Sequence, residues 1–278
     1  VEGAYAGPHQ SPYKGSSSEF VDYREYHPGD EIRSIDWKAY ARSDRPFIKL
    51  FEKETDMNGY LLVDGSASMG FGGPDYRRYL PDPGPSKLEY ACCLAAALAY
   101  LMVKQGDKVG LTLFDERVTD HRPPGGTFPH LYNLLNALEG RQAGRRTSVA
   151  RALREAYALH RRRGLLIVIS DFLDEPRDIF KALSLYTHRG FEIILFHIVH
   201  QHEWDLPPLD SVEFVDAESG ESLTAAPRDL AAAYRKKMED FVATLAGMAR
   251  ARNIDYRFTH TATPYSAVLR RYLLRRAR

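Results

Sequence analysis

The sequence predicts an α/β protein built on a doubly wound, mostly parallel sheet. From residue 59 onward, short apolar runs alternate with segments of helical periodicity, which is typical of parallel strands joined by right-handed crossovers. Two of the runs, residues 165–169 and 193–196, are apolar at every position, which indicates a sheet covered on both faces. The 278 residues, 44% of them hydrophobic, are enough for one large domain with an appendage.

The elements can be assigned in order from the local sequence. We expect strands at residues 60–63, 108–114, 164–170, 191–199 and 254–258, with residues 117–122 folding back beside the second of them. Ser86 and Glu89 have the spacing of a capping box, so a helix should begin there and run to about residue 104. We expect further helices at residues 129–138, 149–162, 176–188 and about 228–250.

The chain divides into three parts by its local composition and sequence pattern. Residues 1–58 begin with turn formers and continue as dense mixed charge with aromatic residues, so we expect an irregular, partly β segment. Within it, residues 28–30 should form a turn and residues 47–51 a short strand. Residues 59–260 should form the α/β domain. Residues 261–278 are basic and amphipathic, and we expect a C-terminal helix or tail there.

Composition excludes several classes of protein. Lys and Arg number 38 and Asp and Glu 37, whereas a generic nucleic-acid binder is far more basic. The longest uncharged stretch has 14 residues, too few to cross a bilayer, and residues 1–18 lack the apolar run of a signal peptide. Cys92 and Cys93 are neighbours on a predicted helix, which suits neither a disulfide nor a zinc cage. We therefore expect a soluble, cytoplasmic protein whose two cysteines are small core residues.

Oxygen-bearing side chains follow two of the predicted strands. Asp64, Ser66 and Ser68 occupy alternate positions after the first strand, and Asp171 ends the strand at residues 164–170. Doubly wound sheets bind ligands beyond the carboxyl ends of their strands, where the strand order reverses. Thr147, just before a predicted helix, could add a third hydroxyl from a neighbouring loop. All five are hard ligands that suit magnesium or manganese, so we predict one divalent cation there.

Each candidate ligand also has a structural explanation. Asp64 could be a turn residue that accepts backbone hydrogen bonds. Asp171 could cap a helix, or could act on the cation through a water molecule. Ser148 is adjacent to Thr147, and either hydroxyl could cap the helix that follows.

The spacing of these residues resembles the metal-ion-dependent adhesion site of von Willebrand factor A domains. That motif is Asp-x-Ser-x-Ser followed by a distant Thr and a distant Asp. The resemblance implies a von Willebrand factor A-like fold and one bound Mg²⁺, Mn²⁺ or Ca²⁺. Of the two hydroxyls just before the helix predicted at residues 149–162, the resemblance favours Thr147 over Ser148.

The N-terminal segment carries a second resemblance. Residues 18–20 (SEF), 24–30 (REYHPGD), 33–37 (RSIDW) and 41–42 (AR) are similar to the signature of the domain of unknown function 58 family. Its bacterial and archaeal members carry this charged segment immediately before a von Willebrand factor A-like domain. The resemblance covers about residues 5–200. Many members have upstream transmembrane helices, and since this sequence shows none, we expect membrane contact only through a partner.

The resemblance and the ligand chemistry together predict a binding role. Genes of this family often lie beside those of MoxR-type AAA+ ATPases, which implies an adaptor or co-chaperone working with such an ATPase or its client. Hydroxyls are neutral ligands, so a cation held by one or two carboxylates keeps a positive charge and an open position. An acidic side chain of a partner protein could fill that position. We therefore expect a non-enzymatic, metal-dependent interaction module, and expect the long loop at residues 71–85 to shape partner choice.

Enzymatic functions fit the sequence less well. Residues 66–70 lack the first glycine of a nucleophile elbow, and a haloacid dehalogenase-type phosphatase would have a second acid where Ser66 stands. The glycines at residues 70–73 come too late for a dinucleotide fingerprint, and a P-loop is absent. A metal-dependent hydrolase or phosphatase using the same site is the alternative that the sequence leaves open.

Two other clusters have structural explanations that we prefer. A zinc site is conceivable at His197, His200 and His202, since the last two would share a face in an extended segment. No carboxylate or thiol pattern completes it. The charged residues of the N-terminal segment should form an ion-pair network that fixes it to the main domain, with Trp37 as a packing anchor; they are Arg24, Asp30, Arg33, Asp36 and Arg42.

Overall fold

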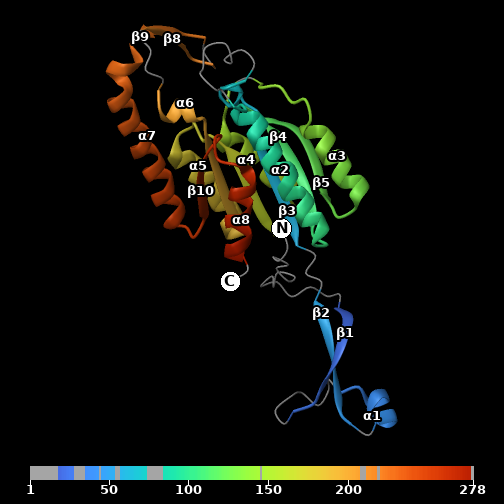
Figure 1. Cartoon of the computed structure of the whole chain (residues 1–278). Coiled ribbons are helices and arrows are strands. Elements are labelled where there is room, and N and C mark those ends of the chain that lie inside the picture. The colour runs from blue at the N-terminus through green and yellow to red at the C-terminus, as the bar shows by residue number, and fades with distance from the viewer. Residues whose placement is uncertain are drawn as a thin grey trace. The chain divides into compact units, whose positions relative to one another are not determined.

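The computed structural model describes residues 18–27, 35–43, 45–53, 57–73, 84–144, 146–206, 211–217 and 220–276. The chain divides into two compact units, Val1–Met57 and Asn58–Arg278, which are drawn in Figure 1. The second unit includes the C-terminal helix α8 (Tyr265–Arg276), which packs on α2 (Lys87–Lys104). The turn expected at residues 28–30 and most of the loop expected at residues 71–85 lie outside the described residues.

The first unit contains two antiparallel strands and a short helix. β1 (Ser18–Glu25) pairs with β2 (Phe47–Lys53), where a strand was expected, and α1 (Trp37–Ser43) lies between them in the sequence. Asp36 caps α1, because its Oδ1 accepts hydrogen bonds from the backbone amides of Lys38 (2.9 Å) and Ala39 (3.3 Å).

The structure describes Trp37 and two of the charged residues, Asp36 and Arg42, for which the sequence predicts an ion-pair network. Trp37 is 60% exposed and meets the ring of Tyr40 edge-on, so our prediction of a buried anchor is wrong. Arg42 donates to the carbonyl of Lys38 within its own helix. The remaining members of the predicted ion-pair network, Arg24, Asp30 and Arg33, have side chains outside the described part of the chain.

The second unit is built on a six-stranded sheet. Its strands, in spatial order, are β10 (Asp255–His260), β7 (Glu192–Val199), β6 (Leu165–Ser170), β3 (Asn58–Asp64), β4 (Lys108–Phe114) and β5 (Val118–Gly125). All neighbours are parallel except the edge strand β5, which runs antiparallel to β4. The chain moves from β3 outward to β5 and then continues from β6 outward to β10, so the strand order reverses between β3 and β6. The predicted doubly wound, mostly parallel sheet is confirmed.

Helices cover both faces of this sheet, as Figure 1 shows. The sheet-facing residues alternate along β3, where Tyr60 and Leu62 join the core cluster formed with the helices on one face. Those helices are α4 (Val149–Leu159), α5 (Pro176–His188) and α7 (Pro227–Arg250). α2, α3 (Phe128–Leu138) and α8 form the other layer, with α2 in contact with β3, β4, β6 and β7.

Three features of this unit differ from the sequence expectations. α4 ends at Leu159 rather than residue 162, because His160 leaves helical geometry and its buried ring packs on Tyr60. Cys93 is exposed and Cys92 half-buried, so the prediction of two core cysteines is wrong for Cys93; α2 is buried mainly on its sheet-facing side. Short elements that were not predicted are α6 (Gln201–Trp204) and the hairpin of β8 (Val212–Val215) and β9 (Ser222–Ala225).

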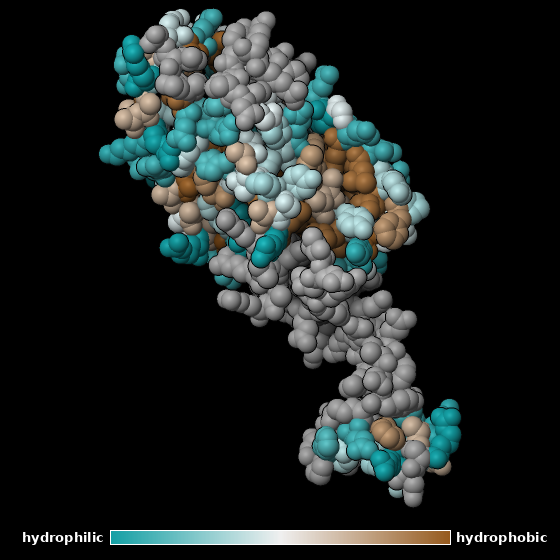
Figure 2. All heavy atoms as spheres, in the orientation of Figure 1, coloured by the Kyte–Doolittle hydropathy of each residue, from teal (hydrophilic) through white to brown (hydrophobic). Residues whose placement is uncertain are grey.

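The outward faces of α2 and α3 carry apolar side chains. Ala96 and Ala97 on α2 keep part of their surface accessible, and Phe128 on α3 is 54% exposed. Figure 2 shows hydrophobic surface over these two helices. Within the described residues, no helix combines the length and the apolar composition that a membrane span requires.

Candidate functional site

The candidate site lies where the strand order reverses. β3 and β6 are parallel neighbours with Val63 opposite Ile169, so Asp64 and Ser170 end adjacent strands at the same edge of the sheet. After β3 the chain forms a short 3-10 turn at Ser68–Gly70. α2 then begins at Lys87, with the capping box of Ser86 and Glu89 formed as the spacing predicts. Such a reversal point is where doubly wound sheets bind ligands.

Asp64 is a fully buried carboxylate surrounded by neutral donors. Its Oδ1 accepts a hydrogen bond from the backbone amide of Ser66 at 2.9 Å. Its Oδ2 accepts from the hydroxyl of Ser170 at 2.6 Å and from that of Thr147 at 3.5 Å. Within the described residues, no lysine or arginine forms an ion pair with this carboxylate.

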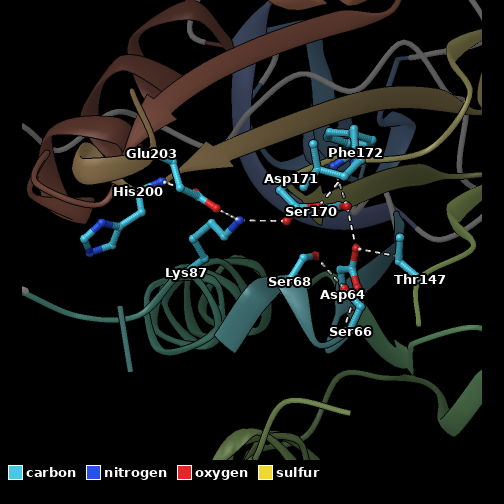
Figure 3. A network of polar contacts seen from close by, with 11 residues as sticks. Asp64, Ser66, Ser68, Lys87, Thr147, Ser170, Asp171, Phe172, His200 and Glu203 are labelled. Atoms are coloured by element: carbon cyan, nitrogen blue, oxygen red, sulfur yellow. Dashed lines mark hydrogen bonds and ion pairs between the residues drawn. The ribbon is translucent and has the colours of Figure 1, made fainter. Parts of the chain in front are cut away.

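The two serines connect Asp64 to the second aspartate. The hydroxyls of Ser66 and Ser68 lie 3.2 Å apart in a hydrogen bond, and Ser68 also donates to Asp171. All five residues singled out in the sequence therefore lie in one network, which Figure 3 shows from close by. Of the two hydroxyls left open beside α4, Thr147 reaches Asp64, whereas Ser148 is the N-cap residue of α4 and forms no side-chain capping hydrogen bond.

Sequence reasoning missed a buried ion triad on the other side of Asp171. The Nζ of Lys87 lies 2.8 Å from Asp171 Oδ2 and 2.6 Å from Glu203 Oε1. The side chains of Lys87 and Asp171 are 1% and 2% exposed and that of Glu203 is 18% exposed. The sequence contains one indication that Lys87 is buried, since it is the first residue of a helix that is apolar on nearly every side. No comparable signal existed for Glu203, which belongs to the unpredicted helix α6.

The two aspartates differ in their electrostatic environment. Burial, and next the nearby charge of Asp171, raise the pKa of Asp64 to about 7, against the opposing effect of its hydrogen bonds from Ser170 and Ser66. Burial also opposes ionisation of Asp171, but the ammonium of Lys87 outweighs it and holds the pKa of Asp171 below its usual range. The charge of Asp171 is thus compensated within the protein, whereas that of Asp64 is not.

The turn after β6 fixes the orientation of Asp171. Phe172 has a φ of 54°, a left-handed conformation that costs a non-glycine residue about 1–3 kcal/mol. Its amide donates to the Ser170 hydroxyl at 2.9 Å, and the amide of Leu173 donates to Asp171 Oδ1 at 3.3 Å. The turn buries the ring of Phe172 and leaves Leu173 46% exposed beside the site.

The donor set and the charge balance fit a divalent cation. Asp64, with the hydroxyls of Ser66, Ser68 and Thr147, offers the hard oxygen ligands that Mg²⁺ prefers. Three carboxylates and one ammonium, counting Glu203, leave the ionised network with a charge of −2, which one divalent cation would neutralise. Both oxygens of Asp171 are already engaged, so it would act through Ser68 or through water.

The histidine cluster does not form a metal site. In the described part of the chain, no group of three or more His, Cys, Asp or Glu side chains is arranged to hold a metal. His197 is buried and its Nδ1 hydrogen-bonds the Tyr256 hydroxyl at 2.5 Å. His200 and His202 do not lie in an extended segment, because they begin helix α6, where His200 Nδ1 accepts from the His202 amide.

Comparisons with known proteins support the family and the fold. The family model described as "Protein of unknown function DUF58" matches residues 22–244. The uncharacterized protein Rv1480 of Mycobacterium tuberculosis is 28% identical over 223 residues, which cover 79% of this chain and 67% of that protein.

Two solved structures match most of this chain, and one of them has a similar fold. An aerotolerance-related membrane protein from Bacteroides fragilis matches with a TM-score of 0.54 at 16% identity, over 79% of this chain and 98% of that one; at this identity the likeness shows the fold alone. The vWF domain of the pili tip protein Mfa5 from Porphyromonas gingivalis matches 80% of this chain and 96% of that one, at 12% identity. Its TM-score of 0.39 is too low to indicate a shared fold. On the match to its family model, this chain belongs to the DUF58 family of proteins of unknown function.

Proposed function

We propose that this chain is a non-enzymatic protein-interaction module that binds one divalent cation, Mg²⁺ in the first place, and uses it to capture an acidic side chain of a partner. The observation that supports this most strongly is the carboxylate of Asp64. It is fully buried at the reversal point of the sheet, and its hydrogen-bond donors are the hydroxyls of Ser170 and Thr147 and the backbone amide of Ser66. A buried carboxylate without a cationic partner is costly, and a bound cation would remove that cost.

The residues of the site would share the work as follows. Asp64 would supply a negative charge that no lysine or arginine of the described residues pairs with, and the hydroxyls of Ser66, Ser68 and Thr147 would supply neutral oxygens. The charge of Asp171 is already balanced by Lys87. A cation held in this way contacts one carboxylate of the chain directly, so it keeps local positive charge and an open position that can attract a carboxylate from another molecule. Ser68 is only partly buried and Leu173 is exposed, which leaves the rim of the site open to a partner.

For the partner, we propose a MoxR-type AAA+ ATPase or its client, with this chain as adaptor or co-chaperone. The support is the frequent proximity of DUF58 genes to those of such ATPases, together with the charge that a cation would carry at this site. Purification of the chain from its native host with Mg²⁺ or with EDTA, followed by mass spectrometry, tests this partner. An ATPase recovered equally well in EDTA would contradict metal-dependent capture.

Hydrolase or phosphatase activity at the same residues is less well supported by the contacts. A serine nucleophile needs an adjacent general base. The hydroxyls of Ser66 and Ser68 instead bond to each other, and Ser68 donates to Asp171, a carboxylate already paired with Lys87. Generic esterase and phosphatase substrates with Mg²⁺ should therefore give no turnover. Turnover that disappears in Ser68→Ala would overturn the binding assignment.

Calorimetry of Mg²⁺ binding tests the cation itself. Wild type should bind one Mg²⁺ and gain thermal stability from it, while Asp64→Asn should do neither, because asparagine keeps the shape and the acceptor oxygen but removes the charge. Asp178→Asn is the matched control, since Asp178 is an exposed carboxylate in the first turn of α5 and should leave Mg²⁺ binding intact. Equal binding by wild type and Asp64→Asn would refute the proposal.

A further inference from the structure

In the proposed function, the buried lysine beside the candidate cation site only balances the charge of Asp171. Lys87 is the first residue of α2, is 1% exposed, and ends between two carboxylates from different elements (Figure 3). A fully buried lysine is rare unless it is paired. Because Lys87 is paired with the candidate ligand Asp171, its charge should affect how the site binds a cation.

We infer that Lys87 is a positioning residue that acts as a tethered cation: it withdraws Asp171 from direct ligation and makes cation binding weak until an acidic partner group arrives. This inference rests on the proposed function and adds to it a link between the two binding events. Among the carboxylates of the described network, Asp64 is then the one that contacts the cation directly.

The contacts of Asp171 oppose its direct ligation of a cation. Its Oδ2 accepts from Lys87 at 2.8 Å, its Oδ1 accepts from the Leu173 amide at 3.3 Å, and Ser68 donates to it as well. Direct ligation would require Asp171 to release the ammonium. Lys87 is held from its other side by Glu203 at 2.6 Å and is shielded from solvent, so no water can take the place of the lost partner.

The charges of the network make cation binding weak until an acidic group arrives. Charge interactions are strong in a buried site because the effective dielectric constant is low. The fixed ammonium therefore opposes the entry of a second cation into the same network and cancels the attraction of one carboxylate. A carboxylate from a partner restores that attraction. Binding of the cation should then strengthen binding of the acidic group, and the reverse, by the same factor.

Magnesium titration calorimetry on two variants at Lys87 and one control variant tests this inference. Lys87→Met with Glu203→Gln removes one positive and one negative charge, so the network keeps its net charge while Asp171 loses its ammonium. We expect this double variant to bind Mg²⁺ at least about tenfold more tightly than wild type, a gain of about 1.4 kcal/mol, because Asp171 becomes free to ligate the cation directly. Lys87→Arg keeps the charge and should bind as wild type does. Lys104→Met, an exposed lysine in the last turn of the same helix, is the matched control.

A second titration, in excess acetate as a soluble carboxylate, measures the link between cation and acid. Acetate should tighten Mg²⁺ binding to wild type and to Lys87→Arg, and should have less effect on the double variant. A purely structural role of Lys87 would not change this dependence. If the single variant Lys87→Met does not fold without Mg²⁺, the double variant decides the matter.

The possible outcomes separate this inference from the proposed function. Wild type that binds Mg²⁺ as tightly as the double variant refutes the inference and leaves the cation site standing. Failure of wild type and all variants to bind Mg²⁺ refutes both. Tight binding by the double variant with weaker, acetate-dependent binding by wild type would support the inference that Lys87 opposes the cation.

Discussion

The loop that follows the serines should be intolerant of a single methyl group at Gly72. Gly72 has a φ of +84°, and a Cβ built there would lie 2.5 Å from His200 Nε2. The ring of His200 cannot easily move, because it is buried and its Nδ1 accepts a hydrogen bond from the His202 amide at 3.2 Å. Gly72→Ala therefore combines backbone strain with a steric overlap.

A second glycine isolates the steric part of this effect. Gly106 has a φ of +85°, and nothing lies within 4 Å of a Cβ placed there. Gly106→Ala should thus lose about 1–2 kcal/mol of unfolding free energy from left-handed strain alone. Gly72→Ala should lose the same amount plus about 1–3 kcal/mol for overpacking against the histidine ring. The difference between the two variants measures the contact with His200.

Urea unfolding of the three proteins under one buffer condition provides the assay. Both variants should shift the midpoint without changing the slope, since the surface exposed on unfolding is the same. Equal losses for Gly72→Ala and Gly106→Ala would show that His200 yields freely, and would refute the packing argument. In Gly72→Ala, the displacement of the loop should also reach the candidate site, because the carbonyl of Phe71 accepts a hydrogen bond from the Lys87 amide at 3.2 Å.

Two further variants test buried polar groups of the domain. Burial, and next the charges of His121 and Arg189, lower the pKa of His160 to about 3 from its ordinary 6.5. The unfolded chain then binds the proton first, so stability should be lost as the pH falls below 6.5, by about 1.4 kcal/mol per pH unit. His160→Gln should flatten this dependence in urea unfolding at pH 7 and pH 5, and an unchanged slope would contradict it. Ser170→Ala removes the 2.6 Å donor to Asp64 and should cost about 1–3 kcal/mol in thermal unfolding without metal; no loss would mean that Asp64 finds another donor.

Most of the fold could be predicted because its signals are local. The strands of the sheet are short, continuous apolar runs, and the capping box of Ser86 and Glu89 marks the start of α2 within one residue. Helix ends depend on tertiary contacts, and His160 is the example. Its ring packs on Tyr60 from a strand 100 residues earlier, which stops α4 at a point that periodicity cannot reveal.

The candidate ligands could be predicted for a topological reason. Residues that follow neighbouring parallel strands lie at one edge of the sheet, so Asp64 and Asp171 had to lie close together once β3 and β6 were neighbours. The triad could not be predicted in the same way. Lys87 meets Asp171 across 84 positions of sequence and Glu203 across 116, and Glu203 depends on a four-residue helix without a periodic signal.

A ligand motif and the net charge of its surroundings are two separate properties of a cation site. The Asp-x-Ser-x-Ser pattern determines which oxygen atoms can face a cation, and this can be read from residues a few positions apart. The net charge around those atoms depends on every ionisable group buried with them. Of the four such groups here, Asp64 and Asp171 belong to the motif, whereas Lys87 and Glu203 do not. Cation affinity follows the charge at least as strongly as the geometry. The same motif beside an apolar residue in place of Lys87 should therefore bind a cation tightly without a partner.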